Sequence, residues 1–184
     1  MDLSGKFLIA MPGMGDPRFA HAVVMLCAYS DTGAMGLIVN KPAPQLRFAD
    51  LLDQLGLPQR ADVPDLPVQF GGPMETGRGF VLHSGEWFGA EGTMWLGPDL
   101  AMTSTRDILG DIAAGRGPRR ALLALGYAGW GPGQLDAEIL ENGWLTAEAD
   151  PELIFAKPNA TKWEAALRAL GVDPISLSAT AGRA

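Results

Sequence analysis

The apolar residues of this chain occur in short runs that glycine and proline interrupt, and this pattern limits the fold more than any other feature. Clear runs cover residues 7–11, 22–29, 34–39 and 121–127. Each run has five to eight residues, which is the usual length of a buried strand. With 24 Gly and 14 Pro among 184 residues, turns must be frequent and the elements short. The pattern therefore predicts a sheet of short strands.

Four stretches show helical spacing of their apolar residues instead. They cover residues 48–55, 104–115, 132–142 and 161–170. Ser104 is expected to be the N-cap of the second helix, and Gly56 and Gly115 follow their helices where a C-terminal cap belongs. Leu140 is expected to face inward with the other apolar residues of the third helix.

Strands and helices follow one another irregularly, which favours an α+β fold over a doubly wound parallel sheet. Further strands are expected at residues 67–70, 79–83, 93–96, 143–147 and 153–155. Residues 31–33 form a short glycine-containing loop between two apolar runs, and this predicts an antiparallel hairpin. Asp16 followed by Pro17 is typical of a helical turn with its N-cap.

The chain shows no linker that could separate two folding units. We therefore expect a single domain over residues 1–175, and a small, polar C-terminal tail that frays over residues 176–184. The first residues carry no basic segment and only a five-residue apolar run, too short for a signal peptide or a membrane span. The expectation is a cytoplasmic protein that does not enter the membrane.

Charge and cysteine content exclude several classes of protein. The net charge is −7, and the densest cationic cluster is Arg116, Arg119 and Arg120 in one loop. Binding to a phosphate backbone depends on clustered cations, so nucleic acid is disfavoured as a partner. Cys27 is the single cysteine, which rules out an intramolecular disulfide and a cysteine-based zinc site.

The run GYAGWGPGQLDAEILENGW, residues 126–144, is the most unusual stretch. It holds two Trp, one Tyr and five Gly, yet no His, Cys, Ser, Lys or Arg. We expect a sharp turn over residues 129–133 from a strand into a helix, with aromatic side chains beside it. Such a helix start can attract an anion, or the glycines can simply allow a tight turn with positive φ. The usual nucleophiles and bases are missing in either case.

Few residues elsewhere could perform chemistry. The neighbours of Cys27 are apolar and carry no positive charge, as expected for a buried thiol rather than a reactive one. His21 and His83 could act as acid or base, but a histidine at a strand end is more often a structural residue. No spacing indicates a metal site, and no motif indicates a cofactor.

Taken together, the segments of this chain resemble the YqgE/AlgH family of bacterial proteins from end to end. The matching segments are residues 7–12, 16–17, 19, 34–42, 71–73, 78–83, 126–130, 134–135 and 138–139. The resemblance implies one α+β domain whose mixed, mainly antiparallel, bifurcated sheet curls into a pseudo-barrel with flanking helices. It supplies no catalytic residues, although one branch of the family is named as a transcriptional regulator of exopolysaccharide synthesis.

One departure from the family concerns Cys27. Many relatives have Glu-His directly after the matching cysteine, whereas this chain has Ala28 and Tyr29. The resemblance therefore argues against a nucleophilic or redox role for this thiol.

The preferred hypothesis is a non-enzymatic binding or regulatory protein without a cofactor, whose partner is a small molecule or a protein. The proposed binding residues are Asn40, Lys41, Gly71, Gly72, His83, Tyr127, Trp130 and Gln134. The first alternative is a small hydrolase or transferase that uses His83 with Lys41 or Cys27. The second alternative is direct DNA binding, which the net charge of −7 disfavours. The sequence does not predict the oligomeric state.

Overall fold

A computed structural model describes residues 2–63, 65–89 and 91–181. The described residues form one nine-stranded sheet in the order β6-β7-β5-β8-β3-β2-β1-β9, and β4 pairs in parallel with β8. The strands are β1 (Lys6–Ala10), β2 (Val23–Ser30), β3 (Gly33–Ile38), β4 (Val68–Phe70), β5 (Met74–Ser84), β6 (Thr93–Gly97), β7 (Leu100–Thr103), β8 (Ala121–Trp130) and β9 (Trp144–Glu148). All other pairs along the path are antiparallel.

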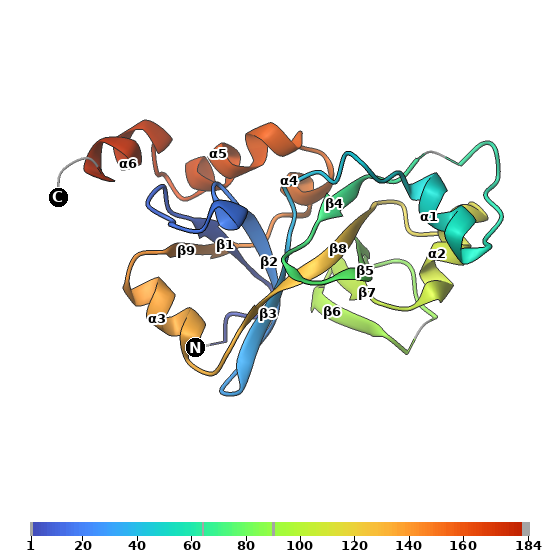
Figure 1. Ribbon diagram of the computed structural model, residues 1–184, viewed down its shortest axis with the longest axis horizontal. Helices are drawn as coiled ribbons and strands as arrows, with labels where there is room; N and C mark the ends of the chain where they lie inside the picture. Colours follow the sequence, from blue (N-terminus) through green and yellow to red (C-terminus); the bar gives the residue numbers. More distant parts are fainter. Residues whose placement is uncertain (1, 64, 90, 182–184) are drawn as a thin grey trace.

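The long strand β8 makes the sheet bifurcate. Its first part pairs with β5, and its last three residues pair with β3. Between them Gly126 has a φ of +74°, and a Cβ there would lie 2.4 Å from the Gly72 oxygen. Only glycine fits this bend without strain. Figure 1 shows β8 crossing the centre of the molecule from one half to the other.

This left-handed bend at Gly126 turns β8 from one half of the sheet to the other. The two halves share this strand, so the sheet curls into an open half-barrel rather than two separate layers. The expected α+β fold with a bifurcated, curled sheet is confirmed.

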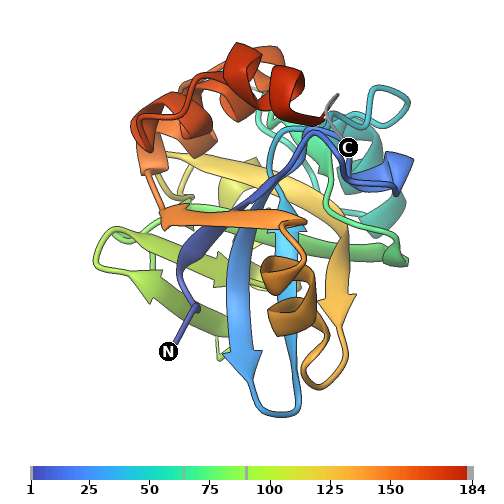
Figure 2. The ribbon, with the colours of Figure 1, turned by 90° about the vertical axis from the view of Figure 1, so that its left-hand side faces the viewer.

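Six helices and one 3-10 turn flank the sheet in the described residues. They are η1 (Pro17–Phe19), α1 (Phe48–Leu55), α2 (Arg106–Ala113), α3 (Gln134–Leu140), α4 (Pro151–Phe155), α5 (Asn159–Ala169) and α6 (Pro174–Ala181). Figure 2 shows α4, α5 and α6, coloured orange to red, across one end of the curled sheet.

The buried side chains form three clusters, which follow from the alternation of strand residues between two faces. The first cluster fills the inside of the curl and reaches α4 and α5 through Ile154 and Leu167. The second lies between β1–β3 and α3, whose Leu135 is buried. The third lies between β5, β8 and the helices α1 and α2, with Leu52 and Ile108 fully covered. Each helix group therefore covers one apolar face.

Several local predictions are confirmed. Strands β2 and β3 form the expected antiparallel hairpin, with Ser30 opposite Gly33. Helix α1 ends at Gly56, whose φ of 68° is left-handed. The Asp16 side chain accepts a hydrogen bond from the Arg18 amide and so caps η1.

Other local predictions are wrong. Residues 153–155 are helical rather than a strand, because Asp150 accepts a hydrogen bond from the Glu152 amide and Pro151 occupies the first helical position. The N-cap of α2 is Thr105 instead of Ser104. The Ser104 amide donates to the Gly92 carbonyl and so continues the strand pairing of β6 and β7.

The last part of the chain also differs in detail from the sequence analysis. Leu140 does not face inward, since 83% of it is exposed. Strand β7 was not predicted. The tail that we expected to fray from Ser176 is helical in α6 up to Ala181, and Asp173 accepts a hydrogen bond from the Ile175 amide at its start. Residues 182–184 lie outside the described residues.

Candidate functional site

The predicted turn over residues 129–133 is shorter than expected. Gly129 and Trp130 still belong to β8, and α3 begins at Gln134 instead of residue 132. Gly133 has a φ of 71°, in agreement with the tight-turn interpretation. The Gly131 amide, which could have met an anion, donates to Gln134 Oε1 at 3.0 Å. The start of this helix is therefore occupied by the side chain of its own first residue.

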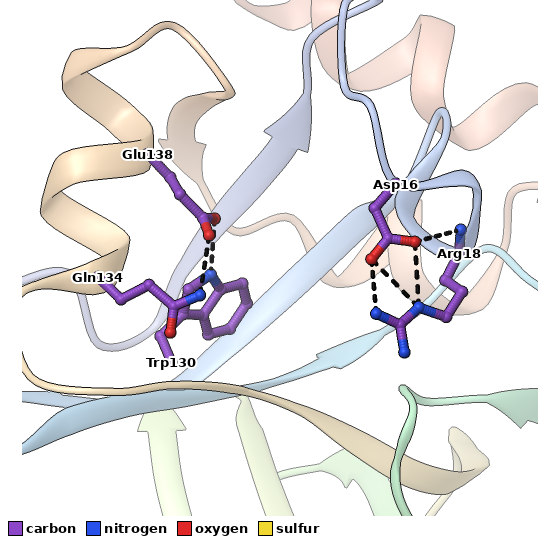
Figure 3. Close-up of polar contacts among 5 residues, drawn as sticks. All are labelled: Asp16, Arg18, Trp130, Gln134 and Glu138. Atoms are coloured by element: carbon purple, nitrogen blue, oxygen red, sulfur yellow. Dashed lines mark hydrogen bonds and ion pairs between the residues drawn. The ribbon is translucent and has the colours of Figure 1, made fainter.

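Trp130 and Gln134 are both bound to Glu138, as Figure 3 shows. Glu138 Oε2 accepts from the indole nitrogens of Trp130 at 2.9 Å and Trp144 at 2.8 Å, and Oε1 accepts from Gln134 Nε2 at 3.0 Å. Both indoles are buried. One carboxylate thus attaches α3 to β8 and β9, and these two predicted site residues have a structural role.

A second carboxylate in Figure 3, that of Asp16, bonds only locally, at the start of η1. Asp16 contacts both the backbone amide and the guanidinium of Arg18, with the closest approach 2.7 Å. These hydrogen bonds lower the pKa of Asp16. This ion pair is exposed and serves the 3-10 turn.

Asn40 and Lys41 form hydrogen bonds that connect neighbouring backbone segments. Asn40 Oδ1 accepts from the Val23 amide at 2.9 Å, and Asn40 Nδ2 donates to the His21 carbonyl at 2.7 Å. The Lys41 carbonyl accepts from the Phe70 amide at 2.7 Å. The segment after β3 is therefore held between β2 and β4.

Gly71 and Gly72 allow two chain segments to approach closely. A Cβ on Gly71 would lie 2.3 Å from the Gly126 oxygen, and one on Gly72 would lie 2.1 Å from the Tyr127 carbonyl carbon. No larger residue fits there without moving β8. These glycines shape the bifurcation of the sheet.

His83 is fully buried, and both of its ring nitrogens have partners. Nδ1 lies 2.9 Å from the Ser84 carbonyl, which can only accept, so Nδ1 carries the proton. Nε2 lies 2.8 Å from Thr103 Oγ1, which lies 2.8 Å from Thr93 Oγ1. Burial lowers the pKa of His83, so the ring is neutral at neutral pH.

Cys27 is buried on a different face of the sheet from His83. It packs inside the curl with Phe80 and Leu82, whereas His83 contacts Trp87 in the cluster beneath α1 and α2. Because successive residues of β5 point to opposite faces, the sheet itself separates the two side chains. Burial raises the pKa of the Cys27 thiol to about 12.

Lys41 is also far from His83. The segment of Lys41 pairs with β4 at Phe70, β4 pairs with β8, and β8 pairs with β5. Three inter-strand spacings, roughly 14 Å, therefore lie between the Lys41 backbone and β5. Neither of the pairs that the hydrolase hypothesis required is formed.

A buried polar cluster that was not predicted from the sequence lies beside Asn40. Lys162 of α5 is 2% exposed, and its Nζ donates to the carbonyls of Val39 at 2.7 Å and Ile154 at 2.8 Å. Burial lowers the pKa of Lys162 to about 8. Gln69 is also 2% exposed, and its Nε2 donates to Asn159 Oδ1 at 3.2 Å. The sequence signal for this cluster was the position of Lys162 on the inward face of an amphipathic helix.

Of the eight predicted residues, Tyr127 lines a hollow that could receive a ligand. We call this hollow the methionine groove; its volume is about 560 Å³, and it is lined mainly by Met35, Arg78, Phe80, Met94, Met102 and Tyr127. It lies where β6 faces the β2–β3 hairpin across the open side of the curl. The Tyr127 and Phe80 rings meet edge to face at 5.9 Å. A hydrogen bond to Glu75 raises the pKa of Tyr127.

Two more polar hollows of about 560 and 590 Å³ adjoin Arg119 and Arg120. The cations of this loop are paired: Arg119 with Glu86 at 3.9 Å, Arg120 with Glu152 at 2.6 Å, and Arg116 with Asp111 at 3.4 Å. Little positive charge is left there to attract an anion.

The described residues contain no group of three or more His, Cys, Asp or Glu side chains that could hold a metal ion. Within the same part of the chain, no helix is both long and apolar enough to cross a bilayer.

Comparison with known proteins gives a consistent result. A family model described as AlgH-like matches residues 7–175. A UPF0301 protein of Paracoccus denitrificans is 58% identical, over 100% of this chain and 97% of the relative. A UPF0301 protein of Jannaschia is 57% identical, over 100% of this chain and 96% of the relative.

Two solved structures have similar folds. The AlgH protein of Pseudomonas aeruginosa gives a TM-score of 0.80 at 45% identity, over 100% of this chain and 97% of that chain. A protein of Corynebacterium diphtheriae gives a TM-score of 0.73 at 20% identity, over 92% of this chain and 87% of that chain, and this likeness concerns the fold alone.

Proposed function

The chain belongs to the AlgH-like family, and we propose that it is a binding protein without catalytic activity of its own. The observation that carries the proposal is the methionine groove. Its lining is mainly apolar and aromatic, with Arg78 and Glu91 as its charged members. The thiol of Cys27, the imidazole of His83 and the amine of Lys162 are all buried elsewhere. The groove can hold a ligand, but none of these three reactive groups lines it.

The lining of the groove suits recognition of an apolar group. Methionine side chains are flexible and polarisable, so they adapt to differently shaped partners. Met35, Met94 and Met102 come from three strands and surround the Phe80–Tyr127 pair. A volume of about 560 Å³ lies within the range of small-molecule sites and also admits a few side chains of a protein partner.

We further propose that any effect on transcription is indirect and is exerted in the cytoplasm through a partner. The net charge of −7 and the paired arginines support indirect action over contact with DNA. A gel-shift assay at moderate salt tests this point. Retardation of a DNA fragment by the purified protein, lost as salt is raised, would overturn it.

Binding is tested by two-dimensional NMR with a library of small organic fragments. The expected hits shift the amide signals of Met35, Met94, Met102 and Tyr127. A Met94→Glu variant should lose these hits, whereas the matched control Leu140→Glu, which also alters an exposed apolar residue, should keep them. Hits confined to the hollows beside Arg119 and Arg120 would refute the groove as the binding site.

Catalysis is tested separately with p-nitrophenyl acetate and p-nitrophenyl phosphate. We expect no turnover above that of the buffer. Turnover that disappears in His83→Ala or Cys27→Ala, in variants that remain folded, would contradict the non-enzymatic function.

A further inference from the structure

Strand β6 leaves the curled sheet unclosed along one seam. It pairs with β7 on one side, and no described strand pairs with its other side. At one end of the seam Gly5 lies against the Leu96 carbonyl, since a Cβ on Gly5 would be 2.4 Å from that oxygen. At the other end the seam opens into the methionine groove, which Met94 and Thr93 line.

The free side of β6 presents backbone hydrogen-bonding groups. The Ser104 amide donates to the Gly92 carbonyl, and Met94 stands two residues further along, opposite Met102. In an antiparallel ladder the bonded pairs alternate with unbonded ones. Thr93 and Trp95 therefore turn their N–H and C=O groups away from β7, toward the seam.

The side chains of β6 are not those of a protected edge. Sheet edges usually carry charged residues or proline, which oppose pairing with another chain. The strand Thr93–Gly97 contains neither, and its Met94 and Trp95 are 41% and 52% exposed. Phe88, 71% exposed, lies 6.4 Å from the Trp95 ring. Exposed apolar side chains here mark a surface for a partner.

The charge at the mouth of the groove is negative. Arg78 lies 3.7 Å from Glu75 and 5.0 Å from the centre of the Phe80 ring, so its charge is already engaged. Glu91 lines the groove and is exposed, and no described cation pairs with it. A partner with Lys or Arg beside an apolar residue would complement this arrangement.

We propose that the seam binds an extended segment of another protein, which adds to the sheet as a strand beside β6. The segment pairs with the free backbone groups of Thr93 and Trp95, inserts one apolar side chain between Met94 and Tyr127, and brings a Lys or Arg to Glu91. This mode of recognition takes affinity from the backbone and specificity from alternate side chains. The proposal rests on the proposed binding function and names the class of partner.

The test begins with a library of short random peptides displayed on phage and selected on the full-length protein. Enriched peptides should carry an apolar residue flanked by Lys or Arg. A synthetic peptide of the enriched sequence should bind at micromolar concentration, and it should shift the amide signals of Gly92, Thr93, Met94 and Met35.

Two variants locate the contact. Met94→Glu should weaken binding of the synthetic peptide about tenfold or more, because a charge would enter the apolar groove. Glu91→Lys should weaken it severalfold, an effect that raised salt reduces. Leu140→Glu is the matched control and should bind as the unaltered chain does. Both altered positions are exposed, so Glu91→Lys keeps the test valid if Met94→Glu fails to fold.

Three outcomes would overturn the proposal. The first is a selection that enriches no peptide, and the second is a set of enriched peptides that bind Met94→Glu and Glu91→Lys unchanged. The third is a dimer in light scattering that Met94→Glu converts to monomer. The last result would mean that a second copy covers β6. If fragments still bind in the groove while peptides do not, the proposed binding function stands and this inference alone fails.

Discussion

Replacing Glu138 tests whether one carboxylate attaches α3 to the sheet. In Glu138→Ala the indole N–H groups of Trp130 and Trp144 lose their acceptor, and both rings are buried. A buried donor left without a partner costs about 1–3 kcal/mol. Glu138 itself is half-buried, so water can partly replace it, and we expect a total loss of about 3 kcal/mol in the free energy of unfolding.

Glu138→Gln provides a sharper comparison. Both indoles donate to the same oxygen, Oε2, so a glutamine oxygen in that place keeps both hydrogen bonds. Its amide group would then face Gln134 Nε2, which loses its acceptor. We expect a loss of about 1 kcal/mol, clearly smaller than in the alanine variant.

Thermal and urea unfolding followed by tryptophan fluorescence measure both changes. For a chain of this length about 1 kcal/mol corresponds to roughly 2–4 °C in Tm, so Glu138→Ala should melt about 6–12 °C lower. Leu140→Ala on the exposed side of the same helix is the control, with an expected change within about 0.5 kcal/mol. Equal losses in the alanine and glutamine variants, or no loss in either, would refute the role assigned to Glu138.

Three further predictions concern the bend of β8 and two buried groups. Gly126→Ala should lower the free energy of unfolding by about 3 kcal/mol or more in urea titrations, because its φ of +74° is strained for alanine and the Cβ would meet the Gly72 oxygen at 2.4 Å; a loss below about 1 kcal/mol would contradict this. The Cys27 thiol should react with Ellman's reagent only after unfolding, since burial raises its pKa to about 12; rapid labelling of the folded protein would be inconsistent with that burial. Burial lowers the pKa of Lys162 from 10.5 to about 8, so between these pH values the folded chain binds fewer protons than the unfolded chain. The free energy of unfolding should therefore rise from pH 8 to pH 10.5 relative to that of Lys162→Met. Parallel curves of this free energy against pH for the two proteins would be evidence against the lowered pKa.

The sequence predicts the separate elements better than their connections. The apolar runs that became β1, β2 and β3 and the helical spacing of α1 depend on local periodicity, which the chain displays openly. Residues 153–155 are too few for periodicity to separate strand from helix, and the capping pair Asp150-Pro151 was the better signal.

The candidate site was predicted less well, for a physical reason. Residues such as His83 and Trp130 stood out by chemical type, yet their polar atoms bind other parts of the chain. The methionine groove consists mainly of ordinary apolar residues, such as Met35 and Met94, from strands far apart in the sequence. Of the predicted residues, Tyr127 is the one found in the groove. The other lining residues come together only through the curl of the sheet, which the sequence does not display.

The sharing of β8 between both halves of the sheet has a consequence for the order of synthesis. Strands β1–β7 leave the ribosome before β8, which occupies residues 121–130 of 184. Until then β3 and β5 each lack one of their two neighbouring strands. The nascent chain therefore completes neither half until about two thirds of it has been made. Both halves then gain the strand that they share at the same moment.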